Sequence, residues 1–294
     1  TMSTAAELRY TLITKLADLK AFLDIARKQG FLAIDTETTS LNAAAAELVG
    51  VAMAVAPGRA CYVPLRHTNK ANVNANGQTG MDFEDTQDTV SCAQIAFHEA
   101  MQLLQDVFED SAILKIGHNL KYDSHVLLRP HNGGVKLVSI DDTMCLSYVL
   151  DTGVVDRHSL DYLALHWLDH QTIKYEDVCG KGVKQVSFAS VSPASVLDYA
   201  AEDADVTLRL WQILKPRLVG SRVASVYERL ERPLIPVLAQ MESRGIPVQQ
   251  TSLARMSNDF AGRMTNYQNE IHKLAGVEFN IASPMQLGEI LFDK

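Results

Sequence analysis

The sequence predicts an α/β fold followed by a helical C-terminal segment. Three apolar, strand-like runs lie close together in the first quarter of the chain, and strands alternate with helices in the part that follows. Beyond Gly220 only helical patterns remain. With 47% hydrophobic and 21% charged residues among 294, the chain can bury a full core and is not of a disordered type.

The first part of the chain contains one helix and three strands. Apolar residues recur at helical spacing from Lys15 to Gln29, and Gly30 ends this helix. Three strands follow, at residues 31–37, 48–56 and 60–65. A Pro57-Gly58 turn joins the last two, which favours an antiparallel meander. The stretch from His67 to Asp88 is rich in Asn, Gly, Thr and Asp, which predicts a mobile loop.

Strands alternate with helices after this loop. The predicted elements are a helix at 91–109, a strand at 112–117, a helix at 119–128, a strand at 136–140 and helices at 142–150 and 159–168. A long helix then runs from Pro193 to about Leu218. An apolar helical stripe follows, and Gly245 ends it. Thr251 can cap a second helix, and a capping box that begins at Ser283 predicts a third.

Asp35 and Glu37 are the most informative residues of the chain. They end the apolar run that starts at Phe31, so both side chains point to the same face of a strand, about 7 Å apart. Two neighbouring carboxylates repel each other unless a cation or a proton neutralises them, and a hard divalent cation such as Mg²⁺ suits such a pair. Taken alone, Asp-x-Glu is more typical of two solvated acids at the end of a strand than of a metal site.

Two later segments add acids at the start or on one face of a helix. Asn119 is suited to cap a helix whose opening turns contain Asp123, where the helix dipole tolerates an acid. Tyr199 and Asp203 are four residues apart in the long predicted helix and therefore share a face. Together with Asp35 and Glu37, these two segments form a set of three acidic motifs, which is stronger evidence for a site than Asp-x-Glu alone.

As a set, the segments resemble the three motifs of the DEDD superfamily of 3′–5′ exonucleases, here Asp35-x-Glu37, Asn119-x-x-x-Asp123 and Tyr199-x-x-x-Asp203. Over nearly the whole chain the sequence is similar to the proofreading domain of bacterial family A DNA polymerases, the DNA polymerase I type. The similar stretches are IDTETTSL, KIGHNLKYD, RHSLDYLALHWL and YAAEDADVTL. The histidine subtype carries its histidine where this chain has Asp198, so the chain resembles the tyrosine subtype. The resemblance implies a ribonuclease-H-like exonuclease fold, with a mixed central sheet flanked by helices.

The resemblance also implies hydrolysis assisted by two divalent metal ions, with Mg²⁺ expected and Mn²⁺ or Zn²⁺ as substitutes. Asp35, Glu37 and Asp203 would hold the first ion, and Asp35 and Asp123 the second. Tyr199 would orient the attacking water rather than act as a general base, because a phenol has a pKa near 10. These five residues form the predicted catalytic set.

The implied partner is the 3′ end of single-stranded DNA. Leu41 and Tyr175 would wedge between or stack on the last bases, although Leu41 could also be an ordinary core residue. The other predicted nucleic-acid contacts are Thr38, Asn119, Tyr122 and Arg157. Lys181 and Lys184 could contact phosphate or simply belong to a flexible loop.

Other acids and histidines have simpler interpretations. Glu202 and Asp205 lie beside Asp203 but do not share the face of Tyr199. Asp142 precedes a predicted helix and is best interpreted as its N-cap. Surface or capping roles are favoured for the four histidines near the motifs, because no pair has convincing ligand spacing: His118, His158, His166 and His170.

Charge and cysteine usage limit the classes of partner and compartment. A net charge of −8 argues against a broad basic face that grips duplex DNA, whereas a short single strand needs only a narrow groove. No apolar run approaches the roughly 20 residues that cross a bilayer, and no signal-peptide pattern is present, so no membrane contact is expected. The cysteines at 61, 92, 145 and 179 form no C-x-x-C pair, which favours a reducing, cytoplasmic compartment.

The resemblance divides the chain into an exonuclease domain at 1–220 and a helical, truncated start of a polymerase domain at 221–294. The stretch RPLIPVLAQMESRGIPV is similar to the beginning of the polymerase thumb, and no counterpart of the palm aspartates or the fingers helix follows it. The polymerase domain of the same full-length chain is therefore an expected partner. Two alternatives are a ribonuclease D-like exoribonuclease, which shares the motifs, and a non-catalytic scaffold domain.

Overall fold

The computed structural model describes residues 8–68 and 93–293 of the chain. Most of the loop predicted between His67 and Asp88 lies outside the described residues, as does Cys92. The described part forms two compact units, divided between Arg244 and Gly245. We describe each unit by itself.

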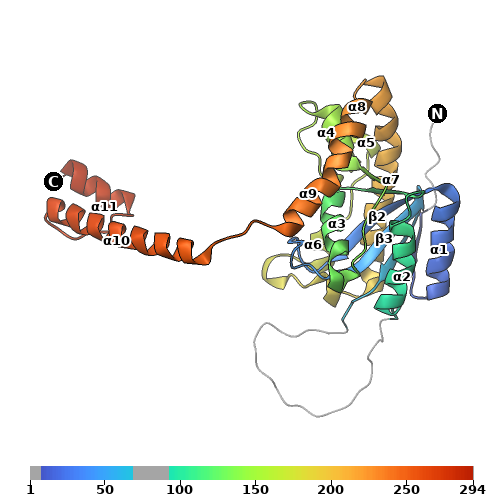
Figure 1. The fold of residues 1–294 in the computed structure, drawn as a ribbon, viewed down its shortest axis with the longest axis horizontal. Helices are drawn as coiled ribbons and strands as arrows, with labels where there is room; N and C mark the ends of the chain where they lie inside the picture. The colour runs from blue at the N-terminus through green and yellow to red at the C-terminus, as the bar shows by residue number, and fades with distance from the viewer. Residues whose placement is uncertain (1–7, 69–92, 294) are drawn as a thin grey trace, which may run out of the picture. The chain divides into compact units, whose positions relative to one another are not determined.

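A six-stranded mixed sheet forms the centre of the first unit, with strand order β1-β4-β3-β2-β5-β6 (Figure 1). The strands are β1 (Arg9–Leu12), β2 (Phe31–Thr38), β3 (Leu48–Ala56), β4 (Arg59–Pro64), β5 (Leu114–Gly117) and β6 (Ile140–Asp142). Strands β2, β3 and β4 pair antiparallel, whereas β1, β5 and β6 each pair parallel with a neighbour. The predicted meander and the mixed α/β sheet are therefore confirmed.

Helices cover both faces of the sheet. On one face lie α1 (Leu16–Gln29), α2 (Phe97–Phe108) and α3 (Leu120–Leu128), with α1 and α2 side by side in Figure 1. The other face packs against α7 (Pro193–Gly220), and α4 (Thr143–Asp151) and α5 (Leu160–Leu168) pack on α7 in turn. The remaining short elements before α8 are α6 (Tyr175–Cys179) and 3₁₀ turns at Pro130–Asn132, Gly182–Lys184 and Phe188–Ser190.

Strand β2 sends alternate side chains to these two layers. Leu32 and Ile34 belong to the core beneath α1 and α2, whereas Ala33 belongs to the core beneath α7. By the same alternation, Asp35 and Glu37 face α7. The residue between them, Thr36, faces the opposite layer, where α3 lies.

Two predicted elements differ from the structure, and one strand is missing from the prediction. The short strand β1 was not predicted, because its four residues are only partly buried at the edge of the sheet. The helix predicted at 91–109 begins at Phe97, since the Gln94 side chain is held by two hydrogen bonds to the backbone of His67. The strand predicted at 136–140 lies at Ile140–Asp142 instead, where it pairs with β5.

Residues after Gly220 continue the first unit. They form α8 (Ala224–Val226), a π-helical turn at Tyr227–Glu231 and α9 (Arg232–Arg244), which contacts α3 and β6. Tyr227 is completely buried, and Ile235 joins the core beneath α1 and α2. The domain boundary predicted after residue 220 separates an exonuclease domain from the start of a polymerase domain, and it stays a prediction.

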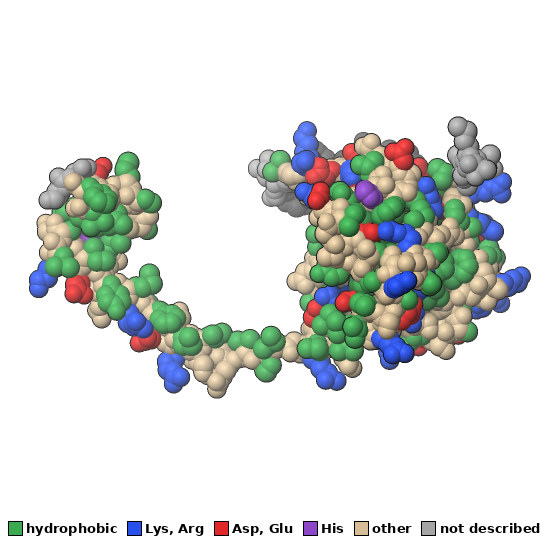
Figure 2. Space-filling model, turned by 90° about the horizontal axis from the view of Figure 1, so that it is seen from above, with side chains coloured by type: hydrophobic (Ala, Val, Ile, Leu, Met, Phe, Trp, Pro, Cys, Tyr) green, Lys and Arg blue, Asp and Glu red, His purple; other side chains and the backbone are tan. Residues whose placement is uncertain are grey.

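The second unit contains α10 (Gln250–Ala275), α11 (Pro284–Gly288) and a π-helical turn at Glu289–Asp293. Neither helix has a buried side chain, and Figure 2 shows hydrophobic side chains exposed along this unit. Phe260 and Met264 of α10 are among the exposed hydrophobic residues. Ser283 caps α11 by accepting a hydrogen bond from the Gln286 N–H, but the predicted capping box is not completed, because the Gln286 Oε1 accepts from the Asn280 N–H instead. Within the described residues, no helix combines the length and the apolar character that crossing a membrane requires.

Candidate active site

Three carboxylates from two elements meet at one end of β2. Asp35 and Glu37 project from β2, and Asp203 projects from α7, which packs on the same face of the sheet. One carboxylate oxygen of each lies within 4.8 Å of the others. The close approach of α7 depends on small residues such as Ala33 and Ala200, which are fully buried between the helix and the sheet.

Asp123 reaches the same strand from the opposite layer. Its Oδ1 accepts hydrogen bonds from the Thr36 hydroxyl at 2.6 Å and from the Thr36 backbone N–H at 3.1 Å. Asp123 is almost completely buried, so these two bonds fix its carboxylate against the residue between Asp35 and Glu37. Sequence reasoning missed Thr36, although its place between the two acids marks it as the strand residue that faces the other layer.

Burial raises the pKa of all four acids. The pKa values of Asp35 and Glu37 are raised well above their usual range, first by burial and then by the negative charges of the neighbouring acids. Burial raises the pKa of Asp123 to about 7 against the opposing effect of the Thr36 hydrogen bonds. Burial, with Glu202 and Asp161 nearby, raises the pKa of Asp203 to about 8.

These acids suit a divalent cation. The Glu37 Oε1 atom is buried and has no hydrogen-bond partner among the described residues, which is costly for a carboxylate oxygen. No Lys or Arg side chain is recorded in an ion pair with Asp35, Glu37 or Asp203 among the described residues. Hard divalent ions bind carboxylate oxygens and would neutralise the mutual repulsion that raises the pKa values.

The raised pKa values predict how stability depends on pH without divalent ions. Unfolded aspartate has a pKa of about 3.9, so the folded chain retains protons that the unfolded chain releases. This stability is present at low pH and is lost as pH rises through about 7 for Asp123 and about 8 for Asp203. We therefore expect the unfolding free energy in EDTA, measured with urea, to fall between about pH 5 and pH 8. The slope should become shallower in Asp203→Asn, and an equal slope in both chains would contradict this assignment.

Tyr199 lies within an aromatic group next to the acids. Its ring contacts those of Tyr175 and Phe188, with centroids 6.3 and 6.0 Å away. Burial and the charges of Glu37 and Asp203 raise the pKa of Tyr199 far above neutrality, so its hydroxyl is a proton-bearing hydrogen-bond donor. Phe188, which also stacks on Tyr175, was not singled out from the sequence, because it lies in a 3₁₀ turn far from the motifs.

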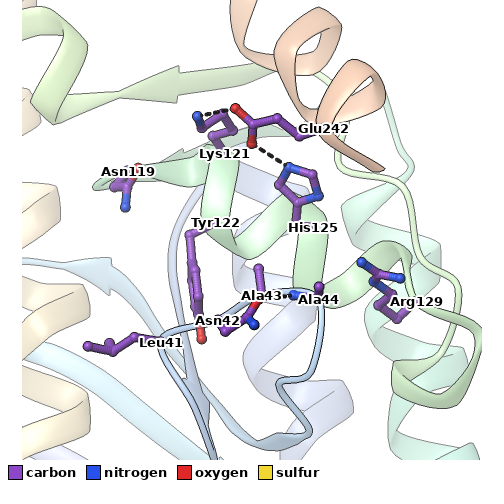
Figure 3. Close-up of a pocket in the computed structure, with 10 residues that line it drawn as sticks. All are labelled: Leu41, Asn42, Ala43, Ala44, Asn119, Lys121, Tyr122, His125, Arg129 and Glu242. Carbon is purple, nitrogen blue, oxygen red and sulfur yellow. Dashed lines mark hydrogen bonds and ion pairs between the residues drawn. The ribbon is translucent and has the colours of Figure 1, made fainter. Parts of the chain in front are cut away.

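A second group of predicted residues borders a cavity of about 430 Å³ (Figure 3). Leu41, Asn119 and Tyr122 line it, and Leu41 is 97% exposed, so the alternative that it is a core residue is wrong. Thr38 is hydrogen-bonded to the Tyr122 hydroxyl at 2.5 Å. Figure 3 also shows Glu242 of α9 bridging Lys121 and His125 of α3.

The other predicted contacts are more scattered. Tyr175 is 36% exposed and stacks on Phe188 at the edge of the acid group. Arg157 is exposed in the connection between α4 and α5. Lys181 pairs with Glu176 on the surface, so the structure provides it with a partner inside the protein.

The neighbouring acids have structural partners, and the N-cap role predicted for Asp142 is confirmed. Glu202 accepts hydrogen bonds from the Ile173 N–H and is paired with His170, and Asp205 accepts one from the Gly58 N–H at 2.7 Å. Asp142 caps α4. Among the described residues, no histidine belongs to a group of side chains that could hold a metal ion.

Two capping predictions are wrong. Thr251 lies inside α10, whose N-cap position is occupied by Gln249. Asn119 occupies the N-cap position of α3, but its backbone is left-handed, with φ of 63°, and its side chain makes no capping hydrogen bond. The Asp142 carboxylate caps α3 instead, by accepting hydrogen bonds from the N–H groups of Asn119 and Leu120.

Comparisons with known proteins agree with this geometry. A family model described as 3′–5′ exonuclease matches residues 10–219. DNA polymerase I of Rhizobium leguminosarum is 45% identical over 97% of this chain and 28% of its own length, so the chain spans less than a third of this relative.

Two solved structures share the fold. The polymerase domain of Pol1 from M. smegmatis, in complex with DNA primer-template and dNTP, has a TM-score of 0.68 at 20% identity and covers 96% of this chain and 40% of its own. Brucella melitensis NrnC has a TM-score of 0.55 at 22% identity and covers 81% of this chain and 95% of its own.

Proposed function

The chain belongs to the 3′–5′ exonuclease family of DNA polymerase I, and from this premise we propose that it removes 5′-mononucleotides from the 3′ ends of single-stranded DNA. The observation that carries the proposal is the meeting of Asp35, Glu37 and Asp203 around the unpaired oxygen of Glu37. Clustered carboxylates without a cation lower the free energy of unfolding, so a role in catalysis explains this acid group better than a role in stability.

Four acids would hold two divalent ions in this site. Asp35, Glu37 and Asp203 are the proposed ligands of one ion, and Asp123 with Asp35 those of the second. Such ions lower the pKa of the attacking water and neutralise charge that develops on the phosphate and on the leaving 3′ oxygen. The Thr36 hydrogen bonds would keep the Asp123 carboxylate in place for this role.

Tyr199 and Glu37 would orient the attacking water. The Tyr199 hydroxyl retains its proton at neutral pH, so it can donate a hydrogen bond to the water oxygen but cannot remove a proton from it. Glu37 lies in the same acid group, and a carboxylate has a second oxygen that can accept a hydrogen bond from the same water. We therefore assign Tyr199 the positioning of the nucleophile and not general-base catalysis.

The DNA end would enter between two groups of side chains. Exposed Leu41 and half-exposed Tyr175 are available to contact the terminal bases, since aromatic and apolar side chains stack on bases of any sequence. Thr38, Asn119, Tyr122 and Arg157 would contact sugar or phosphate. Few basic residues are needed, because only a short single strand must be held.

The proposed partner within the parent protein is the polymerase domain of the same chain. Support comes from the similarity to DNA polymerase I and from the exposed hydrophobic side chains of α10. We also propose that a full-length parent polymerises DNA, that the chain divides into two domains at residue 220, and that the protein is cytoplasmic.

Two alternatives are less well supported. An exoribonuclease is compatible with the fold, which NrnC shares, but the relative at 45% identity is a DNA polymerase I. A non-catalytic scaffold would have no use for four acids with raised pKa values beside Tyr199.

The test compares three substrates of one sequence with Mg²⁺ present: single-stranded DNA, blunt duplex DNA and single-stranded RNA, each labelled at the 5′ end. We expect progressive shortening from the 3′ end, release of 5′-mononucleotides, and faster digestion of the single-stranded DNA than of the duplex. Shortening of RNA faster than DNA would favour the exoribonuclease, and no digestion of any substrate would favour the scaffold.

A further inference from the structure

One buried carboxylate caps two helices of the exonuclease unit. Asp142 Oδ1 accepts hydrogen bonds from the Met144 N–H at 2.8 Å and the Cys145 N–H at 3.1 Å at the start of α4. Its Oδ2 accepts a hydrogen bond from the Leu120 N–H at 2.7 Å at the start of α3. Asp142 is 1% exposed and forms no ion pair with a Lys or Arg among the described residues, so these N–H groups and the two helix dipoles compensate its charge.

Tyr227 holds the backbone of this residue from the other side. Its hydroxyl accepts a hydrogen bond from the Asp142 N–H at 2.9 Å and donates one to Asp141 at 3.1 Å. Asp141 is fully buried and also accepts hydrogen bonds from Trp211, Lys215 and Arg232. The end of β6 is therefore fastened by a network that includes two residues beyond the matched segment 10–219, Tyr227 and Arg232.

The network leads to one acid of the proposed site. Asp123 lies in the first turn of α3, three residues after Leu120, whose N–H is bound by Asp142. Asn119, which opens the helix, is left-handed and makes no capping bond of its own. The position of the first turn of α3 relative to β2 thus depends on Asp142 at one end and on the Thr36–Asp123 bonds at the other.

We propose that Asp142 and Tyr227 are positioning residues of the exonuclease site, which hold α3 so that Asp123 meets Asp35. The proposal rests on the proposed function for the role of Asp123. It also extends the working exonuclease unit past residue 219, because a tyrosine in the π-helical turn after α8 takes part in it.

Two conservative substitutions test this inference. Tyr227→Phe keeps the buried ring but leaves the Asp142 N–H without its acceptor, which is costly for a buried donor. Asp142→Asn keeps the shape but replaces one accepting oxygen by an NH₂ group, so one helix start loses its cap. Tyr10→Phe is the matched control, because the Tyr10 hydroxyl also donates at 3.1 Å to a buried aspartate, Asp205. Among the described residues, Asp205 forms no hydrogen bond with α3.

The first readout is amide hydrogen exchange at Leu120 and Tyr122, which needs neither metal nor substrate. We expect faster exchange at these amides in Tyr227→Phe and Asp142→Asn but not in Tyr10→Phe, with α1 amides unchanged in all three. The second readout is Mn²⁺ binding followed by electron paramagnetic resonance. Loss of an outer-shell partner typically weakens metal binding at least about tenfold, and kcat should fall by a similar factor while KM for single-stranded DNA stays constant.

Equal effects of Tyr227→Phe and Tyr10→Phe on α3 exchange and Mn²⁺ binding would overturn the proposal, because a general loss of stability would then explain both. Unchanged exchange at both Leu120 and Met144 in Asp142→Asn would overturn it as well, because one of the two helix starts must lose its acceptor. A wild-type chain that binds no Mn²⁺ and digests no DNA would instead contradict the proposed function, and the exchange comparison would still decide whether Asp142 and Tyr227 position α3.

Discussion

Asp203→Ala is expected to lower kcat/KM on single-stranded DNA by about 10³-fold. Metal-assisted neutralisation of transition-state charge is worth several kcal/mol, and each 1.4 kcal/mol or so corresponds to a factor of ten. Asp203 is the only residue of the acid triad that comes from α7, so no carboxylate of the described site replaces it when it is removed. The measurement is the initial rate of 5′-mononucleotide release at a fixed Mg²⁺ concentration.

Two variants of the same helix make this result interpretable. Asp198→Ala removes an exposed acid on α7 at the position where the histidine subtype carries its histidine, and it should leave the rate within about twofold of wild type. Tyr199→Phe should reduce the rate only about tenfold, the value of one hydrogen bond to the attacking water. Equal losses in Tyr199→Phe and Asp203→Ala would show that Tyr199 does more than orient the water.

The local parts of the fold were predictable because their signals lie within short stretches of sequence. The run from Phe31 to Glu37 indicated β2, and the Pro57-Gly58 turn indicated the β3–β4 hairpin. Strand β1 and the start of α2 were not predictable in the same way. Each depends on a partner distant in sequence, β4 for the strand and the His67 backbone for Gln94.

The candidate site shows the same division between local and tertiary information. Spacing alone placed Asp35 and Glu37 on one face and Tyr199 and Asp203 on another, and the structure brings three of these acids together. The sequence does not show that Asp123 is held by Thr36, because the two residues are 87 positions apart and lie in different layers. Nor does it show that Asp142 caps α3 as well as α4, since an N-cap signal identifies only the helix that follows it.

Removal of divalent ions is expected to abolish the exonuclease activity completely, and Mg²⁺ or Mn²⁺ should restore it. The physical reason is that Asp35, Glu37, Asp123 and Asp203 have raised pKa values and hold protons near neutral pH without a cation. In that state they neither activate water nor offset the charge of the reacting phosphate. The measurement is the rate of nucleotide release after dialysis against EDTA, and again after Mg²⁺ is added back.

Binding stoichiometry separates the two proposed ions. Titration of the metal-free chain with Mn²⁺ should give two sites, with affinities that increase from about pH 6 to pH 8, because the ions compete with the protons on Asp123 and Asp203. Asp123→Asn should remove one site and leave the other, since Asp35, Glu37 and Asp203 form a triad without it. Asp198→Ala, which lies outside the acid group, should retain both sites. Digestion that continues unchanged in EDTA, or a single site in the wild-type chain, would contradict the two-ion assignment, because Asp123 would then have no ion to hold.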